Sequence, residues 1–480
     1  MNKYFPFRIL VFAIFIALIV PMLIQDGMFM DGLIYAAISN NLSLGIGSFW
    51  FPKFSDTYFI YYSEQLPLLF GIQSVFFKIL GSTIYTERIF SFLMACLVGF
   101  NIIKIWRLVF SNNYQMKQLE WLPVLLWITI PVVSWSFINN VQETLMAVFS
   151  TAAVYFILKG LLRERKLILN IVLGGICIFC CSFCKGFQGL FPIVTVMFYW
   201  LFLRNITFKK MLWLSLLLLS VPLIIYLILL ANDTSFQTLS SNFNNRIIRT
   251  FTNTNSATTD NRFYLIYRIF TELIPSMLIV LIAFVVYYLK RKRVKVDHYL
   301  RFFGFFISIG IAGSFPLIVT YEQRGFYLCT ALPFFALSLA LLAVPYVSPL
   351  IEIICTKSKG FKLFRIFALI LLFNVIIFSG LQYGKTKRHN DMLHDVYIIG
   401  NIVPNKTTIN FSQSLRQEYA LWGYFARHFN ISLDPNPFNY QKYYLKNKYE
   451  DEKISELYIK VDLDMKLYDL YKKSDITDKH

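Results

Sequence analysis

The sequence predicts an all-α polytopic membrane protein that carries a small α/β domain at its C-terminal end. Hydrophobic residues make up 57% of the 480 residues and charged residues only 15%, whereas about a quarter of the residues of a soluble domain are charged. Runs of about 20 apolar residues recur along the chain, which is the length that crosses a bilayer. Near residue 385 the composition becomes polar, and this change predicts a domain outside the membrane.

Eleven apolar runs are expected to span the membrane as helices. The first run follows Lys3 and Arg8, as in a secretory signal peptide. No small-residue cleavage pattern comes after it, so we expect a retained helix. The eleven predicted spans are 6–25, 88–108, 119–137, 141–159, 167–183, 187–203, 211–230, 264–289, 298–320, 325–346 and 363–382.

The basic residues determine the predicted topology. The formal net charge is +19, a value that is also compatible with a nucleic-acid partner. Lys and Arg gather, however, in alternate connections, most densely at 159–166, 290–295 and 357–365, as the positive-inside rule requires. We therefore expect a multi-pass inner (cytoplasmic) membrane protein with its N-terminus inside, its C-terminal domain extracytoplasmic and no nucleic-acid partner.

The polar hairpin 26–67 after the first span is the expected catalytic loop. Asp31 precedes Tyr35 by four residues, which places both on one side of a short helix. The opposite side is apolar, so this helix is expected to lie on the membrane surface. Glu64 follows just before Pro67. Two carboxylates at one membrane face favour a catalytic pocket, but a plain amphipathic loop with solvated acids has the same pattern, so both interpretations stay open.

Three more charged residues are expected at the same face. Glu143 begins the span 141–159, either as a pocket carboxylate or as an acid favoured by the helix dipole. Lys185 precedes Gly186 in a tight turn, and Arg324 precedes the span 325–346. Each cation either anchors to lipid headgroups or binds an anionic phosphate, with Gly186 allowing close backbone approach.

The two predicted domains are a transmembrane domain, 1–384, and a small extracytoplasmic domain, 385–480. In the second, 407–411 reads as a strand and 415–429 as an amphipathic helix. A charged and partly disordered end is expected after them.

Metal and nucleotide sites have no support in the sequence. None of the five His residues lies among the outer acids, and neither HxxxH nor HExxH spacing occurs. No phosphate-binding glycine motif occurs either. Most of the seven cysteines lie within apolar runs, where buried thiols are expected. No cofactor and no metal are predicted.

In their order and spacing, these residues resemble the motifs of membrane glycosyltransferases that use a polyprenyl-phosphate sugar donor. The most similar families are the protein O-mannosyltransferases and the lipid A aminoarabinose transferases, which share the GT-C fold. Asp31-Gly-Leu-Ile-Tyr35-Ala resembles their catalytic Asp-Glu-x-x-Tyr segment, and Glu64-Gln-Leu-Pro67-Leu resembles Glu-Lys-Pro-Pro-Leu. The other positions that match are Arg88, Glu143, Lys185-Gly186 and Arg324 with Tyr327 and Pro333.

The chain departs from this pattern at two places. Gly32 replaces the second acid, and Gln65 replaces the Lys, so Lys185 is expected to contribute more to phosphate binding. Some aminoarabinose transferases hold a metal between the position of Glu64 and a later His. Here Asn244 or Asn245 occupies that later place, so no metal is predicted, and a divalent metal stays an alternative.

The resemblance implies an inverting glycosyltransferase with a polyprenyl-phosphate-linked sugar as donor. The acceptor would be a hydroxyl or phosphate of lipid A, another glycolipid or a protein. Asp31, Glu64 and Glu143 are the implied catalytic residues, with Asp31 as the base. The implied substrate-binding residues are Tyr35, Lys185, Arg324 and Tyr327. A transporter or flippase of lipid-linked sugars, or a glycan polymerase, is the alternative.

Overall fold

The structure is a computed structural model that describes residues 2–248, 259, 261–289, 297–319 and 322–474. It forms two compact units. The helical unit contains Met1–Met22 and Ser91–Gln382, and the mixed unit contains Leu23–Phe90 and Tyr383–His480. The hairpin after the first span therefore belongs to the same unit as the C-terminal tail.

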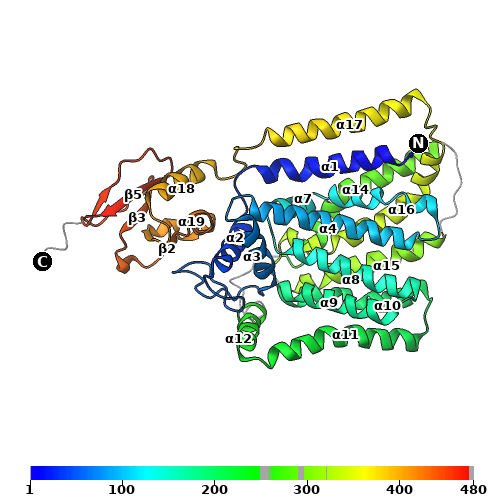
Figure 1. Ribbon diagram of the computed structural model, residues 1–480, viewed down its shortest axis with the longest axis horizontal. Coiled ribbons are helices and arrows are strands. Elements are labelled where there is room, and N and C mark those ends of the chain that lie inside the picture. The colour runs from blue at the N-terminus through cyan, green and yellow to red at the C-terminus, as the bar shows by residue number, and fades with distance from the viewer. Residues whose placement is uncertain (1, 249–258, 260, 290–296, 320–321, 475–480) are drawn as a thin grey trace. The chain divides into compact units, whose positions relative to one another are not determined.

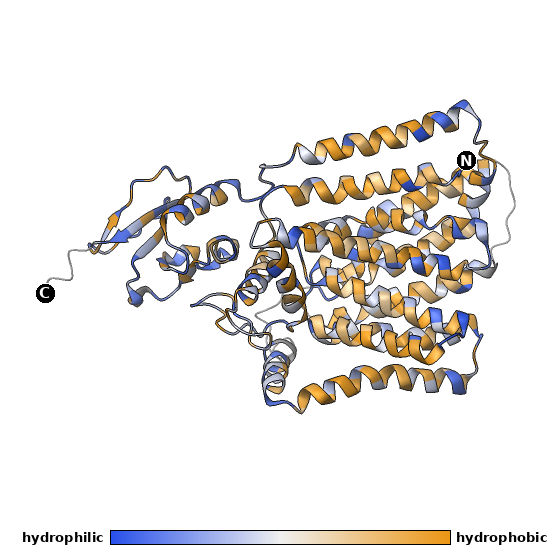
Figure 2. Cartoon of the chain, in the orientation of Figure 1, coloured by the Kyte–Doolittle hydropathy of each residue, from blue (hydrophilic) through white to orange (hydrophobic). Residues whose placement is uncertain are grey.

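The helical unit consists of long apolar helices that run side by side (Figure 1). Their middle portions are hydrophobic and their ends are hydrophilic (Figure 2), as expected for helices that cross a bilayer. The helices are α1 Phe5–Ile24, α4 Thr86–Val109, α5 Tyr114–Lys117, α6 Trp121–Ile128, α7 Pro131–Ile138, α8 Glu143–Arg163, α9 Leu167–Lys185, η1 Gly186–Val194, α10 Thr195–Leu203, α11 Phe208–Leu230, α12 Asp233–Asn242, η2 Phe243–Ile248, α14 Tyr264–Leu289, α15 Asp297–Ser314, η4 Phe315–Val319, η5 Gly325–Thr330, α16 Leu332–Glu352 and α17 Lys359–Gly380. The first residues of α4 and the last of α1 belong to the mixed unit.

Nine helical stretches of the described residues are long and apolar enough to cross a membrane, against the eleven spans expected. One difference lies in the expected span 119–137, which is two helices bent by 78°. Pro131 starts the second of them, and proline cannot supply the N–H that would continue the first helix. Counted as one broken span, this pair raises the number to ten.

The other difference lies in Leu167–Leu203, a single helical stretch of 37 residues that was expected as two spans. Its backbone reverses direction at Gly186, where φ is +79°. A Cβ placed on Gly189 would lie 2.4 Å from the carbonyl of Cys181. In a straight helix, residues eight positions apart are about 12 Å apart. The stretch therefore folds back on itself as two antiparallel segments, as the sequence predicts.

Among its described residues, the mixed unit combines four whole α-helices, two short 3₁₀ helices (η6 Gln413–Gln417 and η7 Pro437–Asn439) and one five-stranded sheet. The strand order is β2-β1-β3-β5-β4. Strand β1 pairs in parallel with β2 and β3, and β5 pairs antiparallel with β3 and β4. The elements are α2 Met30–Ser43, α3 Leu68–Leu80, α18 Asn390–Ile402, β1 Thr408–Phe411, α19 Tyr419–Phe429, β2 Ser432–Asp434, β3 Tyr443–Asn447, β4 Tyr458–Lys460 and β5 Tyr468–Lys473.

Two expectations about this unit were wrong and two are confirmed. The strand near 407–411 and the helix that ends at Phe429 are present. The end that was expected to be partly disordered is ordered through β3, β4 and β5 as far as Lys473, and its last residues, 475–480, lie outside the described residues. Helix α2 lacks the exposed polar face of a helix that lies on a membrane surface. The seven residues from Tyr35 to Asn41 are all buried, and seven residues cover every side of a helix. It packs against α3 and α19.

Candidate active-site residues

In the helical unit, three of the predicted site residues meet. Lys185, at the C-terminal end of α9, forms an ion pair with Glu143 in the first turn of α8. Both side chains are buried, with exposures of 9% and 1%. The Lys185 ammonium also lies 3.6 Å from the centre of the Tyr327 ring, in cation–π contact. A buried ion pair carries a large desolvation cost, so this cluster is a candidate for function.

Neighbouring residues hold this cluster in place. Gln188 donates a hydrogen bond to the backbone oxygen of Tyr327 at 2.9 Å. The Tyr327 hydroxyl donates to Glu322 at 3.3 Å. Gln142, next to Glu143 in sequence, donates to the backbone oxygen of Cys184. The last turn of α9 and the 3₁₀ helix η5 are thereby fixed around the Lys185 ammonium.

Arg324 lies beside this cluster in sequence and is exposed. It directly precedes η5, and its backbone oxygen accepts from the N–H of Tyr327 at 3.0 Å. A second cation, Arg268, was missed from the sequence. Its Nε lies 3.2 Å from the position that a Cβ of Gly325 would occupy. Arg268 pairs with Glu272 at 2.8 Å. The sequence signal that could have revealed it is a pair of opposite charges with i,i+4 spacing inside an apolar run.

In the mixed unit, Asp31 and Tyr35 lie in the first two turns of α2. Asp31 is partly buried and Tyr35 is 6% exposed. The Tyr35 ring packs on Phe70 with centroids 5.9 Å apart. Since Phe70 belongs to α3, this contact fixes the start of α2 against the next helix, and Asp31 is carried on a rigid element.

Glu64 lies in the segment that leads into α3, and it is also partly buried. The pKa of Tyr58 is raised mainly by burial, and the neighbouring Tyr419 and the negative charge of Glu64 raise it further. Tyr58 packs against Trp422 of α19, with ring centroids 4.9 Å apart. Asp31 and Glu64 therefore both belong to the mixed unit, whereas Glu143 belongs to the helical unit.

Asp26, which did not stand out in the sequence as a site residue, is a heavily bonded acid of the mixed unit. Its carboxylate accepts from the Arg88 guanidinium at 2.9 Å, the Tyr397 hydroxyl at 2.6 Å and its neighbour's N–H at 2.6 Å. Burial by itself would raise the pKa of Asp26, but the Tyr397 hydrogen bond and the Arg88 charge outweigh it and lower the pKa. An acid stabilised as its anion in this way is a poor base.

Two further basic groups near Asp26 have shifted pKa values. Burial, with the positive charge of Arg427, lowers the pKa of His428 to about 3. Burial also lowers the pKa of Lys387 to about 7, with Arg88 and Arg388 acting in the same direction. Desolvation by the surrounding side chains is the largest cause of both shifts.

A second buried ion pair stabilises the same unit. Arg427 of α19 and Glu87 of α4 are each 1% exposed and lie 2.7 Å apart. Arg427 also donates to the backbone oxygen of Thr83 at 2.7 Å. Neither Glu87 nor Arg427 stood out in the sequence as a site residue. No local spacing links residues 340 positions apart.

Neither unit has an evident metal centre among its described residues. No group of three or more His, Cys, Asp or Glu side chains is placed to hold an ion there. Asn244 and Asn245 are exposed, and the later loop residues 249–258 lie outside the described residues.

Comparison with known proteins relates the whole chain to solved membrane enzymes by fold. The structure of ArnT from Cupriavidus metallidurans bound to undecaprenyl phosphate matches with a TM-score of 0.65 and 13% identity, covering 96% of this chain and 97% of that one. The apo structure of the same protein matches with a TM-score of 0.60 and 12% identity, covering 96% and 95%.

A third structure is the archaeal oligosaccharyltransferase AglB from Archaeoglobus fulgidus, in complex with an inhibitory peptide and a dolichol-phosphate. It matches with a TM-score of 0.50 and 16% identity, covering 93% of this chain and 69% of that one. No family model and no curated protein matches the sequence. Both structural relatives are of the GT-C type, and this chain has the GT-C fold.

Proposed function

We propose that this protein is a glycosyltransferase that moves a sugar from a polyprenyl-phosphate donor to an acceptor at the outer face of the inner membrane. The buried Lys185–Glu143 pair beside Tyr327 carries the proposal. The GT-C fold supports it, because the matching ArnT structure holds undecaprenyl phosphate. The acceptor is a hydroxyl or phosphate of lipid A, another glycolipid or a protein.

Lys185 and Arg324 are the proposed phosphate ligands. When the bond between the anomeric carbon and the phosphate breaks, the departing polyprenyl phosphate gains a second negative charge. It therefore needs cations placed where that charge develops, more than it needs a proton. The Lys185 ammonium has three N–H donors, and it forms an ion pair with Glu143. Tyr327 lines the same position with its ring.

Asp31 is the proposed general base. It takes the acceptor proton as the acceptor oxygen attacks the anomeric carbon opposite the phosphate, so the configuration inverts. Such a base contributes typically 10²–10⁴-fold to the rate. Glu64 is proposed to orient the acceptor, and Glu143 is proposed to orient the Lys185 ammonium. Tyr35 is proposed to hold the start of α2.

Two measurements test this function. Mass analysis of lipid A and of envelope proteins, from cells with and without the gene, identifies the added sugar and the acceptor. The purified protein, supplied with that donor and acceptor, should then release polyprenyl phosphate in equal amount with the product. Movement of the intact donor between leaflets without transfer would contradict the proposal and favour a flippase.

A further inference from the structure

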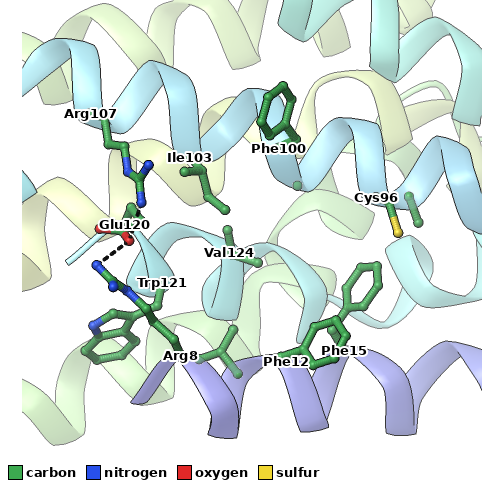
Figure 3. A pocket seen from close by; sticks show the side chains of 13 residues that line it. Arg8, Phe12, Phe15, Cys96, Phe100, Ile103, Arg107, Glu120, Trp121 and Val124 are labelled. Carbon is green, nitrogen blue, oxygen red and sulfur yellow. Dashed lines mark hydrogen bonds and ion pairs between the residues drawn. The ribbon is translucent and has the colours of Figure 1, made fainter. Parts of the chain in front are cut away.

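The helical unit contains a pocket that none of the proposed site residues lines. It lies between α1, α4 and α6 and has a volume of about 420 Å³ (Figure 3), within the usual range for a small-ligand site. Apolar side chains form most of its wall, among them Phe12, Phe15, Phe100, Ile103 and Val124. Phe12 and Phe100 are half exposed, so the pocket opens toward the hydrocarbon phase beside α1 and α4.

One end of this pocket is charged. Glu120, which is 3% exposed, accepts from the Arg8 guanidinium at 2.7 Å and from the Arg107 guanidinium at 2.9 Å (Figure 3). Two guanidinium groups therefore share a single carboxylate. The pocket keeps one positive charge in excess, and a charge in such an apolar setting favours an anionic partner.

The same end presents hydrogen-bonding atoms that the protein leaves unused. Nε of Arg8 and Nε1 of Trp121 are buried donors without a hydrogen-bond partner among the described residues. Oε2 of Glu120 is a buried acceptor that also lacks a hydrogen-bond partner among the described residues. Buried polar atoms of this kind are costly and rare. A ligand would satisfy all three if it offered anionic oxygens to the donors and a hydroxyl to the carboxylate.

The position in the chain indicates the source of such a ligand. Arg8 lies near the start of α1 and Arg107 near the end of α4, the helix ends at which the sequence gathers Lys3, Lys104 and Lys117. Basic pockets between membrane helices at such an end bind anionic lipid headgroups. A zwitterionic choline headgroup offers neither net charge nor a hydroxyl.

We propose that this pocket binds an anionic phospholipid with a hydroxylated headgroup, of the phosphatidylglycerol class. Its phosphodiester contacts Arg8, Arg107 and Trp121, and a headgroup hydroxyl donates to Glu120. One acyl chain follows the apolar wall past Phe12 and Phe100. This inference does not depend on the proposed transferase activity.

Lipid binding to the delipidated full-length protein in detergent tests the headgroup contacts. Native mass spectrometry compares phosphatidylglycerol with phosphatidylcholine of the same acyl chains. Phosphatidylglycerol should bind roughly five- to tenfold more tightly, as one additional cation contact predicts. Arg107→Gln should abolish this preference, because it removes the excess positive charge of the pocket. The substitution is made at a side chain that is half exposed. Lys104→Gln, on the same helix but outside the pocket lining, should retain it.

The acyl-chain contact has its own test, which holds even where an Arg107 variant folds poorly. A Cβ on Gly99, which lines the pocket, meets only Trp127, at 3.7 Å. Gly99→Ala should therefore bind phosphatidylglycerol normally, whereas Gly99→Leu should fill the pocket and lose binding. Equal affinity of the wild type for the two lipids, an unchanged preference in Arg107→Gln, or full binding by Gly99→Leu would each overturn the proposal.

Discussion

The Asp26 carboxylate receives a hydrogen bond from the Arg88 guanidinium at 2.9 Å and another from the Tyr397 hydroxyl at 2.6 Å. Arg88 also donates to the backbone oxygen of Gln25 at 2.6 Å. The backbone N–H and C=O of Asp26 bond to Lys385 and Lys387. One acid thus joins the end of the first span, the start of α4 and the segment leading to α18. These contacts fit a structural role for Asp26, in keeping with our proposal that Asp31 is the base.

Replacing Asp26 should destabilise the mixed unit. In Asp26→Asn, the Arg88 guanidinium, which is 4% exposed, stays buried without its counter-charge. Breaking a buried pair from one side costs about 3–5 kcal/mol. Thermal unfolding of the purified variant measures this loss. Asp391→Asn is the control, because the Asp391–Lys466 pair is about half exposed on both sides, so its loss should leave the unfolding midpoint nearly unchanged.

His428 should make the protein sensitive to acid. Its pKa is lowered to about 3 in the folded protein, against about 6.5 when unfolded, so the unfolded state binds the proton first. The stability that neutral His428 provides is complete above pH 6.5 and is lost as the pH falls toward 3. At pH 5.5 the loss should be on the order of 1 kcal/mol. The lowered pKa of Asp26 adds a further loss below about pH 4.

The His428 effect can be separated from general acid sensitivity by Phe replacement. The His428 ring stacks on Tyr397 and Tyr424 with centroids 5.6 and 5.8 Å away, so His428→Phe keeps the stacking and removes the titration. Unfolding midpoints at pH 7.5 and 5.5 should differ less in this variant than in the wild type. The same difference in both proteins would assign the acid sensitivity to other groups.

The helices of the membrane part were predictable because their signal is local. A run of about 20 apolar residues with basic residues on alternate sides needs no knowledge of distant contacts. The bend in 119–137 is local too, since Pro131 marks it. The strands β3 and β5 were missed although each begins with aromatic and aliphatic residues, Tyr-Tyr-Leu in β3 and Tyr-Asp-Leu-Tyr in β5, because the many charges of the tail suggested disorder.

The site was predictable only where motif residues lie on separately predicted elements. Glu143 and Lys185 were both selected as charges at span ends, and the structure pairs them. Arg427 and His428 were not selected, because their partners Glu87 and Asp26 are 340 and 402 positions away. Burial strengthens the ion pair of Arg427 with Glu87 and lowers the pKa of His428, and burial depends on tertiary contacts that no single segment reveals.

The topology can be tested with a native cysteine. Cys355 is exposed in the connection between α16 and α17, next to the basic residues 357–365, so it should face the inside. An impermeant maleimide added to intact cells should leave Cys355 unlabelled and should label a cysteine introduced as Glu450→Cys in a Cys355→Ser background. Labelling of Cys355 from outside would contradict the positive-inside assignment.

Lys185 should control donor affinity. Lys185→Met keeps the apolar stem and removes the cation, so binding of a polyprenyl-phosphate analogue should weaken roughly 10- to 100-fold, as expected for a charged hydrogen bond. Glu143→Gln keeps the cation and should retain affinity within a few-fold. Lys159→Met is the matched control, since Lys159 lies near the opposite end of α8. If the Lys185 and Lys159 variants bind equally well, Lys185 is a headgroup anchor.

Asp31 is predicted to be the base, and Asp31→Asn separates basicity from shape. The amide keeps the size and hydrogen-bonding reach of the carboxylate but cannot take the acceptor proton. Turnover should therefore fall by about two to four orders of magnitude. Donor affinity should change little, because the donor is bound before the proton moves. Transfer by purified protein and donor binding are measured on the same preparation.

The control for Asp31 comes from the same hairpin. Asp56, paired with Lys53 and 52% exposed, has ordinary solvent contact, so Asp56→Asn should keep nearly full turnover. Asp26→Asn is a poor control, because its loss of stability would lower activity without any part in the chemistry. A variant with near-normal unfolding, normal donor binding and greatly reduced turnover is expected only at Asp31. Normal turnover in Asp31→Asn would remove it as the base, and Glu64, the other acid of the mixed unit proposed to act in catalysis, would be tested next.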